Sequence, residues 1–306
     1  MQRHVIASFI VMGVVLTGGS SAWAADAAPA KPRFKLVKPQ TPEGVTLHTK
    51  LVCAQYGDRE VTLDLYVPDH DKTSPPMPAL LFIHGGGWWK GTIEHSKPLA
   101  ERLAARGYVC ALVDYRLSGE AKYPAALHDC KAALRYLRAN AAKYHIDVDH
   151  IGVIGGSAGG HLSGLVGMTG DDTELEGDGG SAGVSTKVQA CIVMAATMDL
   201  VTAYGKKIGK HAVAFFGGTC AEKPDVYKQA SPITHVNAHD PPTLFIEAEH
   251  DTQKIGRLEM QQKLRAAGIP TDIATLPGAP HPFWMSQPWL DQTADLAADF
   301  FDQYLK

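Results

Sequence analysis

Apolar segments that alternate with helical segments constrain the fold of this chain more than any other feature. Five of them predict buried strands, at Ala79–Ile83, Tyr108–Val113, His150–Ile154, Val188–Ala196 and Thr243–Ala248. Strands read as unbroken apolar runs when both faces of their sheet are covered. Because strands alternate with helices along most of the sequence, we predict an α/β fold with a mostly parallel central sheet and helices on both faces.

Two further strands and five helices complete this pattern. The alternating segment Val61–Val67 predicts a half-exposed strand, and Thr271–Leu276 predicts the last one. Helices are expected at Leu99–Arg106, from Pro124 onward, and at Ser157–Met168, Ile255–Ala267 and Trp289–Leu305. The segment Leu200–His239 has no regular pattern, and we expect it to be an irregular, small lid over the functional site.

The helix that begins at Pro124 has an apolar stripe, because its apolar residues recur at steps of three and four. The stripe consists of Leu127, Cys130, Leu134, Leu137 and Ala141. The basic residues Lys131, Arg135 and Arg138 are predicted to occupy the opposite side of the helix. One face should therefore pack on the sheet.

Composition and charge exclude several classes of protein. The chain has 306 residues with 29 Lys+Arg and 32 Asp+Glu, and a formal net charge of −3. This balance argues against nucleic acid as a partner, which would require a basic face. With 45% hydrophobic and 20% charged residues, the chain is expected to be globular rather than disordered.

The N-terminal segment predicts export. A basic start, a short apolar run and the sequence Ala-Trp-Ala at 22–24 indicate a signal peptide at 1–24. A membrane anchor is the alternative, but the apolar run is far shorter than the roughly 20 residues that span a bilayer, so no stable membrane insertion is expected. The chain then has an extended leader at 25–45, one domain at 46–306, and a secreted or periplasmic location.

The five cysteines give no metal or redox motif. Cys53, Cys110, Cys130, Cys191 and Cys220 form no C-x-x-C pair. Cys110 and Cys191 lie in apolar runs and are expected to be small core residues. An odd number leaves at least one thiol unpaired within the chain.

The sequence Gly155-x-Ser157-x-Gly159 carries the strongest chemical signal. It lies between a predicted strand and a predicted helix, which is the context of a nucleophile elbow. The serine of such an elbow sits on a sharp, strained turn that leaves no room for neighbouring side chains. A nucleotide-binding loop is the alternative. The chain lacks both G-x-x-x-x-G-K-[ST] and G-x-G-x-x-G, so that interpretation is not supported.

A second glycine motif, His84–Trp89 (HGGGWW), directly follows the strand Ala79–Ile83. Acyl transfer passes through an oxyanion, which needs preorganised N–H donors. A glycine run allows backbone N–H groups to point inward, and a further donor is expected on the residue after the nucleophile. We predict an oxyanion hole formed by Gly86, Gly87 and Ala158.

The acid and base are expected after the last two strands. Asp251 follows the strand Thr243–Ala248, and His281 follows Thr271–Leu276, so both lie at carboxyl ends of parallel strands. Ser, Asp and His occur in the order of a hydrolase triad. Other candidates remain. They are Asp199, Glu247 and Glu249 for the acid, and His250 for the base. His161 is predicted to be a packed core histidine.

Together these motifs resemble the α/β-hydrolase superfamily, and more narrowly the secreted esterases of the hormone-sensitive-lipase-like and feruloyl/acetyl-xylan esterase-like (BD-FAE-like) group. The resemblance extends from about Leu51 to Lys306 and includes Tyr115–Leu117 and Tyr123–Asp129. It implies an α/β-hydrolase fold and a serine carboxylic-ester hydrolase with the triad Ser157, Asp251 and His281. It also makes the Trp88 N–H a possible substitute donor in the oxyanion hole.

The expected mechanism forms an acyl-enzyme and needs no cofactor and no metal. Trp88, Trp89 and Trp284 are candidate substrate-binding residues that wall a pocket or stack on sugar rings, with ordinary packing as the alternative. The substrate is expected to be a small-molecule or polysaccharide ester, such as an acyl group on xylan or pectin. Two alternatives remain: a peptidase or amidase on the same fold, and a catalytically inert binding protein. The sequence does not determine the oligomeric state.

Overall fold

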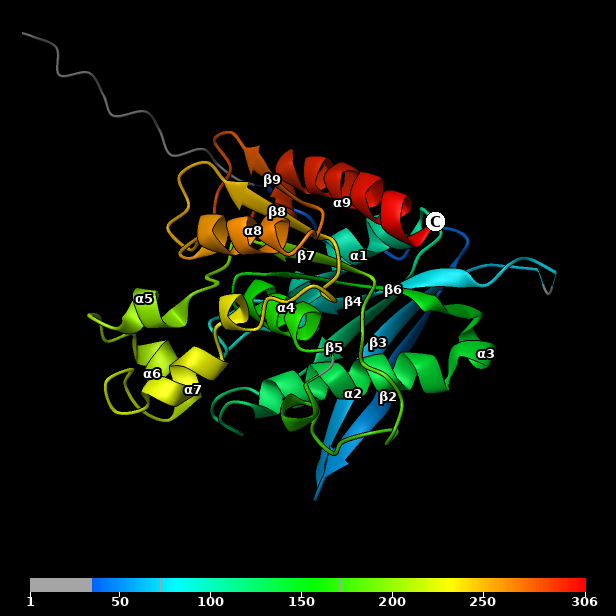
Figure 1. The fold of residues 1–306 in the computed structure, drawn as a ribbon. Coiled ribbons are helices and arrows are strands. Elements are labelled where there is room, and N and C mark those ends of the chain that lie inside the picture. The colour runs from blue at the N-terminus through cyan, green and yellow to red at the C-terminus, as the bar shows by residue number, and fades with distance from the viewer. Residues whose placement is uncertain (1–34, 72, 171) are drawn as a thin grey trace, which may run out of the picture. The chain divides into compact units, whose positions relative to one another are not determined.

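The predicted sheet is present, and its strand order differs from the chain order near the middle. The computed structural model describes residues 35–71, 73–170 and 172–306, and in them the main sheet has the order β2-β3-β5-β4-β6-β7-β8-β9 (Figure 1). The strand β3 pairs antiparallel with β2 and β5, and all other neighbours pair in parallel. The mostly parallel α/β fold is therefore confirmed. The strands are β2 (Val45–Tyr56), β3 (Arg59–Pro68), β4 (Met77–Ile83), β5 (Val109–Asp114), β6 (Ile146–Gly156), β7 (Ala190–Met194), β8 (Thr243–Ala248) and β9 (Thr271–Leu276).

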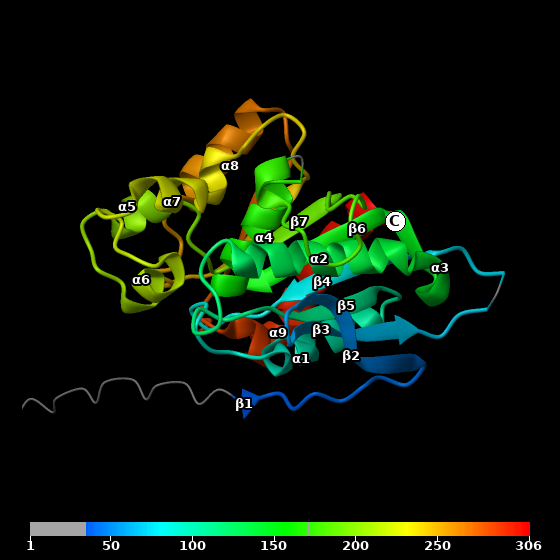
Figure 2. The same cartoon turned by 90° about the horizontal axis from the view of Figure 1, so that it is seen from below.

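Helices cover both faces of this sheet. On one side lie α2 (Ala125–Ala139), α4 (Ala158–Met168) and α8 (Arg257–Ala266), and on the other lie α1 (Lys97–Ala104) and α9 (Trp289–Leu305) (Figure 2). The short helix α3 (Ala141–Tyr144) follows α2. The sheet is thus buried between two helical layers, which explains its unbroken apolar strands.

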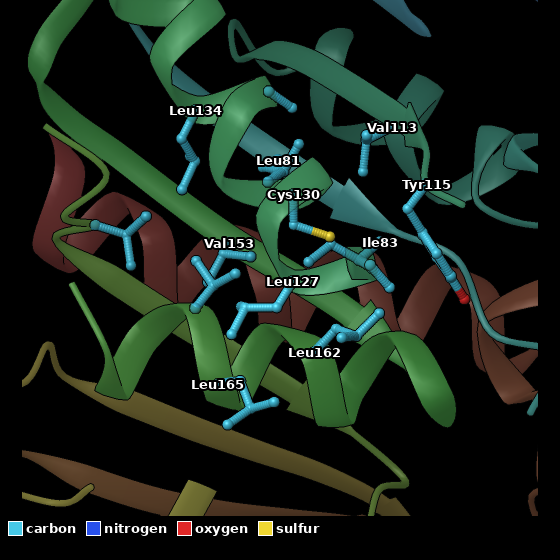
Figure 3. Packing of buried hydrophobic residues seen from close by; sticks show 14 of the residues in the cluster. Leu81, Ile83, Val113, Tyr115, Leu127, Cys130, Leu134, Val153, Leu162 and Leu165 are labelled. Carbon is cyan, nitrogen blue, oxygen red and sulfur yellow. The ribbon is translucent and has the colours of Figure 1, made fainter. Parts of the chain in front are cut away.

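The two faces of β4 contribute to two separate parts of the core. Leu81 and Ile83 pack toward α2 and α4, where Leu127, Cys130 and Leu162 meet them (Figure 3). The intervening residues Leu80 and Phe82 pack toward α1 and α9. This alternation follows from the two-residue period of a strand. Four of the five predicted stripe residues, Leu127, Cys130, Leu134 and Leu137, are fully buried. The fifth, Ala141, lies beyond the end of α2 and is only partly buried.

The basic side of α2 is not solvated. Lys131 is fully buried and Arg135 nearly so, because the loop after α4 covers them. Lys131 donates to the carboxylate of Glu176 at 2.7 Å, and Arg135 donates to the same carboxylate at 3.1 Å. Arg135 also donates to the carbonyl of Gly179 at 2.6 Å. The basic residues therefore anchor a polar loop, a function that helical periodicity does not reveal.

The segment predicted to be irregular contains short helices. These are α5 (Leu200–Tyr204), α6 (Lys210–Phe216) and α7 (Pro224–Gln229). Each has seven residues or fewer, so none is long enough to give a clear helical period in the sequence. Tertiary packing stabilises them instead, since Phe215 and Phe216 of α6 and Tyr227 of α7 are buried together.

The sequence also gave no indication of β2, the edge strand of the sheet. Its pairing with β3 shifts register twice, between His48 and Leu51 and between Val52 and Ala54. These shifts interrupt the alternation of buried and exposed residues that identifies a strand. Only two of the twelve residues of β2 are buried, which weakens the apolar signal further.

The described part of the leader lies against the domain. The strand β1 (Lys35–Leu36) pairs antiparallel with β10 (Ser286–Gln287), and the Val37 N–H donates to the Met285 carbonyl. The described residues, from Lys35 to Lys306, belong to one compact unit. The predicted signal peptide lies outside the described residues. Within the described ranges, no helix is long and apolar enough to cross a membrane.

All five cysteines are free and buried. Cys110 and Cys191 are fully buried, which confirms the prediction that they are core residues. Cys110 faces the helices α1 and α9, whereas Cys191 faces the helices on the other side of the sheet.

Gly159 provides a test of how closely α4 packs on β4. A Cβ atom at this position would overlap the carbonyl oxygen of Ile83, which is backbone and cannot rotate away. We expect Gly159→Ala to lower the free energy of unfolding by about 3 kcal/mol, as severe overpacking does. Urea denaturation measures this loss.

Gly119 supplies the matched control. A Cβ atom there would meet nothing within 4 Å, and its φ is not positive. We expect Gly119→Ala to change the free energy of unfolding by no more than about 0.5 kcal/mol. Equal stability of the two variants would contradict the close packing of α4 on β4.

Candidate active site

Ser157 occupies the sharp turn between β6 and α4. Its φ of 58° and ψ of −121° lie in a region that non-glycine residues rarely adopt. The turn is held on both sides, because the Ser157 N–H donates to the Met194 carbonyl and the Ser157 carbonyl accepts from the His161 N–H, both at 2.9 Å. Such strain costs about 1–3 kcal/mol and persists only where the surroundings enforce it.

The two glycine motifs of the sequence contact each other. A Cβ atom on Gly85 would lie 2.8 Å from the Gly156 carbonyl and 3.3 Å from the Ser157 Cβ. A Cβ atom on Gly156 would overlap the ring of Trp284. The absence of side chains therefore lets the loop after β4 approach the turn at Ser157 directly.

The loop after β4 has three consecutive residues with positive φ. They are Gly86 at 120°, Gly87 at 64° and Trp88 at 63°. The Gly86 carbonyl accepts from the N–H groups of Trp89 at 3.4 Å and Lys90 at 3.2 Å, which closes the loop into a tight turn. Trp88 adopts a conformation that favours glycine, so its surroundings must hold it there.

His84 and Tyr115 fix the start of this loop. The Tyr115 hydroxyl donates to the His84 carbonyl at 3.0 Å, and the two rings stack with centroids 4.3 Å apart. The His84 Nδ1–H donates to the Gly85 carbonyl at 2.8 Å. Burial lowers the pKa of His84 to about 4, so its ring is neutral at neutral pH.

Asp251 and His281 meet at the carboxyl ends of β8 and β9. The His281 Nδ1–H donates to the Asp251 Oδ2 at 2.6 Å, and the Gln253 N–H donates to Oδ1 at 2.7 Å. Burial would raise the pKa of the Asp251 carboxyl, but hydrogen bonds from His281 and Gln253 outweigh it and hold the pKa below its ordinary value. Asp251 is therefore ionised at neutral pH.

The other candidate acids have different partners. Asp199 caps α5 by accepting from the Thr202 N–H at 2.9 Å. Glu247 forms an ion pair with Arg257 at 3.0 Å, and Glu249 accepts from the Gly278 N–H at 3.2 Å. The candidate base His250 is mostly exposed. None of these four makes a hydrogen bond to His281 in the part of the chain that the structure describes.

Ser157 and His281 line one cavity of about 440 Å³, together with Ala158 and Asp251. A neighbouring cavity of about 340 Å³ also contains Ser157 and His281 in its lining. Among the described residues, no hydrogen bond joins the Ser157 hydroxyl to the His281 ring. Catalytic hydrogen bonds are often long before substrate binds.

The lid segment contributes residues that the sequence did not indicate. Tyr204 of α5 and His211 of α6 line the larger cavity, and His211 also lines the smaller one. The ring of His211 stacks on Trp89 with centroids 4.8 Å apart. No motif identifies either residue, because the lid gives no regular pattern from which its helices can be oriented.

The three tryptophans have different environments. Trp88 is only 6% exposed and stacks on Phe215 of the lid, with ring centroids 5.1 Å apart. Trp284 is also buried, and its ring packs beside His281 and Phe283. Trp89 is 47% exposed at the edge of the smaller cavity. Of the three, Trp89 is the most exposed, and its ring contacts His211 and the Lys90 ammonium, which lies 5.5 Å from the ring centroid.

This combination of a mostly parallel sheet, a strained serine after β6 and an Asp–His pair after β8 and β9 defines an α/β-hydrolase. A family model described as BD-FAE matches residues 63–257. The chain belongs to this family, and the resemblance seen in the sequence is confirmed.

Known proteins support the same assignment. Esterase LipC of Mycobacterium tuberculosis is 30% identical over 237 residues, which are 74% of this chain and 58% of LipC. The chain spans about half the length of the curated relatives it matches.

Two solved structures have the same fold. A truncated carbohydrate esterase from gut microbiota has a TM-score of 0.74 and 26% identity, and the match covers 87% of this chain and all of the other. A bifunctional GH43-CE protein of Bacteroides eggerthii has a TM-score of 0.74 and 28% identity, over 84% of this chain and 38% of the other.

The buried histidines make stability depend on pH. Burial lowers the pKa of both His84 and His161 from 6.5 to about 4. Between these values the unfolded chain binds more protons than the folded one. We expect the free energy of unfolding to fall as the pH drops from about 6.5 toward 4. Each of the two histidines should contribute a decrease of about 1.4 kcal/mol per pH unit.

Urea denaturation at about pH 7 and about pH 5 measures this fall. His84→Gln removes one of the two titrating groups and should make the decrease with pH smaller. A parent protein whose stability stays constant or rises over this range would contradict the assignment of neutral, buried histidines.

Proposed function

We propose that this protein is an exported serine carboxylic-ester hydrolase with the triad Ser157, His281 and Asp251. One observation carries the proposal. The buried Asp251 carboxylate accepts from His281 at 2.6 Å, and this pair opens onto the cavity that also contains the strained Ser157. The sequence order of the three residues is that of an α/β-hydrolase triad.

The proposed acylation step begins with His281. Its Nδ1–H is engaged by Asp251, so its Nε2 is the nitrogen that accepts the Ser157 proton. The serine oxygen then attacks the ester carbonyl, and the carbonyl oxygen becomes an oxyanion. The Asp251 carboxylate stabilises the charged His281 ring. As the tetrahedral intermediate collapses, His281 returns the proton to the departing alcohol.

Backbone N–H groups stabilise the oxyanion in this proposal. The donors are Gly86 and Gly87 of the loop after β4, and Ala158 at the first position of α4. The loop approaches Ser157 closely, since a Gly85 Cβ would lie 3.3 Å from the Ser157 Cβ. The positive end of the α4 dipole favours negative charge at the same place.

Deacylation repeats these steps with water as the nucleophile. His281 takes a proton from water, and the water oxygen attacks the acyl carbon to form a second tetrahedral intermediate. As the bond from the acyl carbon to the Ser157 oxygen breaks, His281 returns the proton to that oxygen and the carboxylic acid leaves. This sequence of proton transfers requires no cofactor and no metal.

We further propose that the ester is carried by a carbohydrate. The two solved structures of this fold reported above are named as a carbohydrate esterase and a GH43-CE protein. The half-exposed ring of Trp89 at the edge of the smaller cavity is suited to stacking on a sugar. The predicted signal peptide at 1–24 would bring the enzyme to polysaccharide outside the cytoplasm.

Removal of triad residues tests the catalytic proposal. With a nitrophenyl acetate substrate, we expect Ser157→Ala to lower kcat by about 10⁶ and Asp251→Asn by about 10⁴. Asp199→Asn is the matched control, because asparagine can still cap α5 and the residue does not contact His281. Full activity in Ser157→Ala, or equal losses in the two aspartate variants, would contradict the assigned triad.

A comparison of polysaccharide esters tests the carbohydrate proposal. We expect the enzyme to release acetate or ferulate from acylated xylan or pectin. Trp89→Ala should raise KM for these substrates by about tenfold, since a lost stacking contact costs about 1.4 kcal/mol, and should leave nitrophenyl acetate hydrolysis nearly unchanged. Turnover of small esters alone would refute carbohydrate specificity but not the triad.

A further inference from the structure

Trp88 is a strained residue at the end of the proposed oxyanion loop. Its φ is 63°, and it directly follows Gly86 and Gly87. Its side chain is held by stacking on Phe215, and its carbonyl accepts from the Ser118 N–H at 2.8 Å. Neither contact uses a peptide N–H group of Gly86 or Gly87. Whatever fixes Trp88 also fixes the direction of these groups.

The indole N–H of Trp88 donates to His161 Nδ1 at 3.2 Å. His161 lies in α4, one turn after Ser157, and its backbone N–H donates to the Ser157 carbonyl. The other ring nitrogen, Nε2, bonds the Ala230 carbonyl of the lid at 2.7 Å. His161 therefore links the nucleophile helix, the oxyanion loop and the lid.

The partners of His161 determine its tautomer. An indole N–H can only donate and a carbonyl can only accept, so Nδ1 is the acceptor and Nε2 carries the hydrogen. Protonation of Nδ1 would break the bond to Trp88. Burial lowers the pKa of His161 to about 4, which keeps the ring neutral near neutral pH.

We propose that His161 is a positioning residue for catalysis: through its acceptor Nδ1 it holds Trp88, and thereby the N–H groups of Gly86 and Gly87, in the orientation that stabilises the oxyanion. The inference rests on the proposed function and assigns a role to a histidine that is 1% exposed. A histidine that merely fills core space would not need the acceptor Nδ1. Because each ring nitrogen has its own partner, the two hydrogen bonds can be removed one at a time.

Two substitutions separate the two hydrogen bonds. In His161→Asn the amide oxygen can occupy the position of Nδ1, which retains an acceptor for Trp88 and loses the bond to Ala230. In His161→Gln the amide nitrogen can occupy the position of Nε2, which retains the donor to Ala230 and loses the acceptor for Trp88. The two variants thus remove one bond each from the same buried site.

We expect His161→Gln to lower kcat for nitrophenyl acetate by about 10–100-fold with little change in KM, because small misplacements of catalytic donors have effects of this size. The affinity for a boronic acid, which forms a tetrahedral adduct with the serine, should fall by a similar factor. His161→Asn should retain most of the kcat and of the boronic acid affinity. A purely structural role would not separate these variants.

Trp88→Phe gives an independent test if either His161 variant fails to fold. It keeps an aromatic ring against Phe215, removes the indole N–H and leaves a smaller side chain. We expect the same loss of kcat as in His161→Gln, and no greater loss in the double variant, because both remove one interaction. Tyr227→Phe is the control, since it removes a partly buried lid hydrogen bond to the Gly218 carbonyl at 3.0 Å that does not involve Trp88.

The outcomes distinguish this inference from the proposed function. Equal losses in His161→Asn and His161→Gln, full activity in Trp88→Phe, or additive losses in the double variant would overturn the positioning role. If the parent protein neither turns over esters nor binds the boronic acid, the proposed function fails together with this inference. A parent that turns over esters while Trp88→Phe behaves like Tyr227→Phe refutes the positioning role alone.

Discussion

The elements around the cavity are arranged so that they hold the strained turn at Ser157. A serine with φ of 58° is maintained only because β6 ends and α4 begins around it with both of its backbone groups bonded. The turn also requires glycines, since side chains at Gly156 and Gly159 would overlap Trp284 and the Ile83 carbonyl. The central sheet, the loop after β4 and the last helices therefore all support one residue.

Burial of ionisable groups determines the charge state around that residue. Asp251 remains ionised because hydrogen bonds to its carboxylate outweigh the effect of its burial. His84 and His161 remain neutral because burial is the largest influence on their pKa values. In the proposed mechanism the buried aspartate orients His281, whereas the neutral histidines hold the loop beside the serine through their hydrogen bonds. Burial disfavours the charged form of all three side chains. Hydrogen bonds outweigh this effect at Asp251 but not at His84 or His161, so the aspartate is charged and the histidines are neutral.

The sequence was sufficient where a local pattern carries the information. Strands buried on both faces read as apolar runs, and the glycines around Ser157 and after Ile83 are required by close backbone contacts. The pairing of Asp251 with His281 followed from their positions after neighbouring parallel strands. These features depend on residues near one another in the chain or on one rule of sheet topology.

Other features depend on tertiary contacts and could not be predicted in this way. The lid helices are too short to show a period, and β2 shifts register within its pairing. Lys131 is buried by a loop that begins some forty residues later, and His161 acquires its partners from two distant segments. In each case the partner, rather than the residue itself, determines the role.

Covalent capture of the nucleophile tests the central claim most directly. An organophosphate ester such as paraoxon phosphorylates an activated serine, and mass spectrometry of the intact protein and of its peptides locates the adduct. If Ser157 is the nucleophile, one adduct per chain forms on this residue, at the rate at which esterase activity disappears. Labelling is expected to be much slower in Asp251→Asn. An adduct on another residue, or continued ester turnover after complete labelling of Ser157, would contradict this claim.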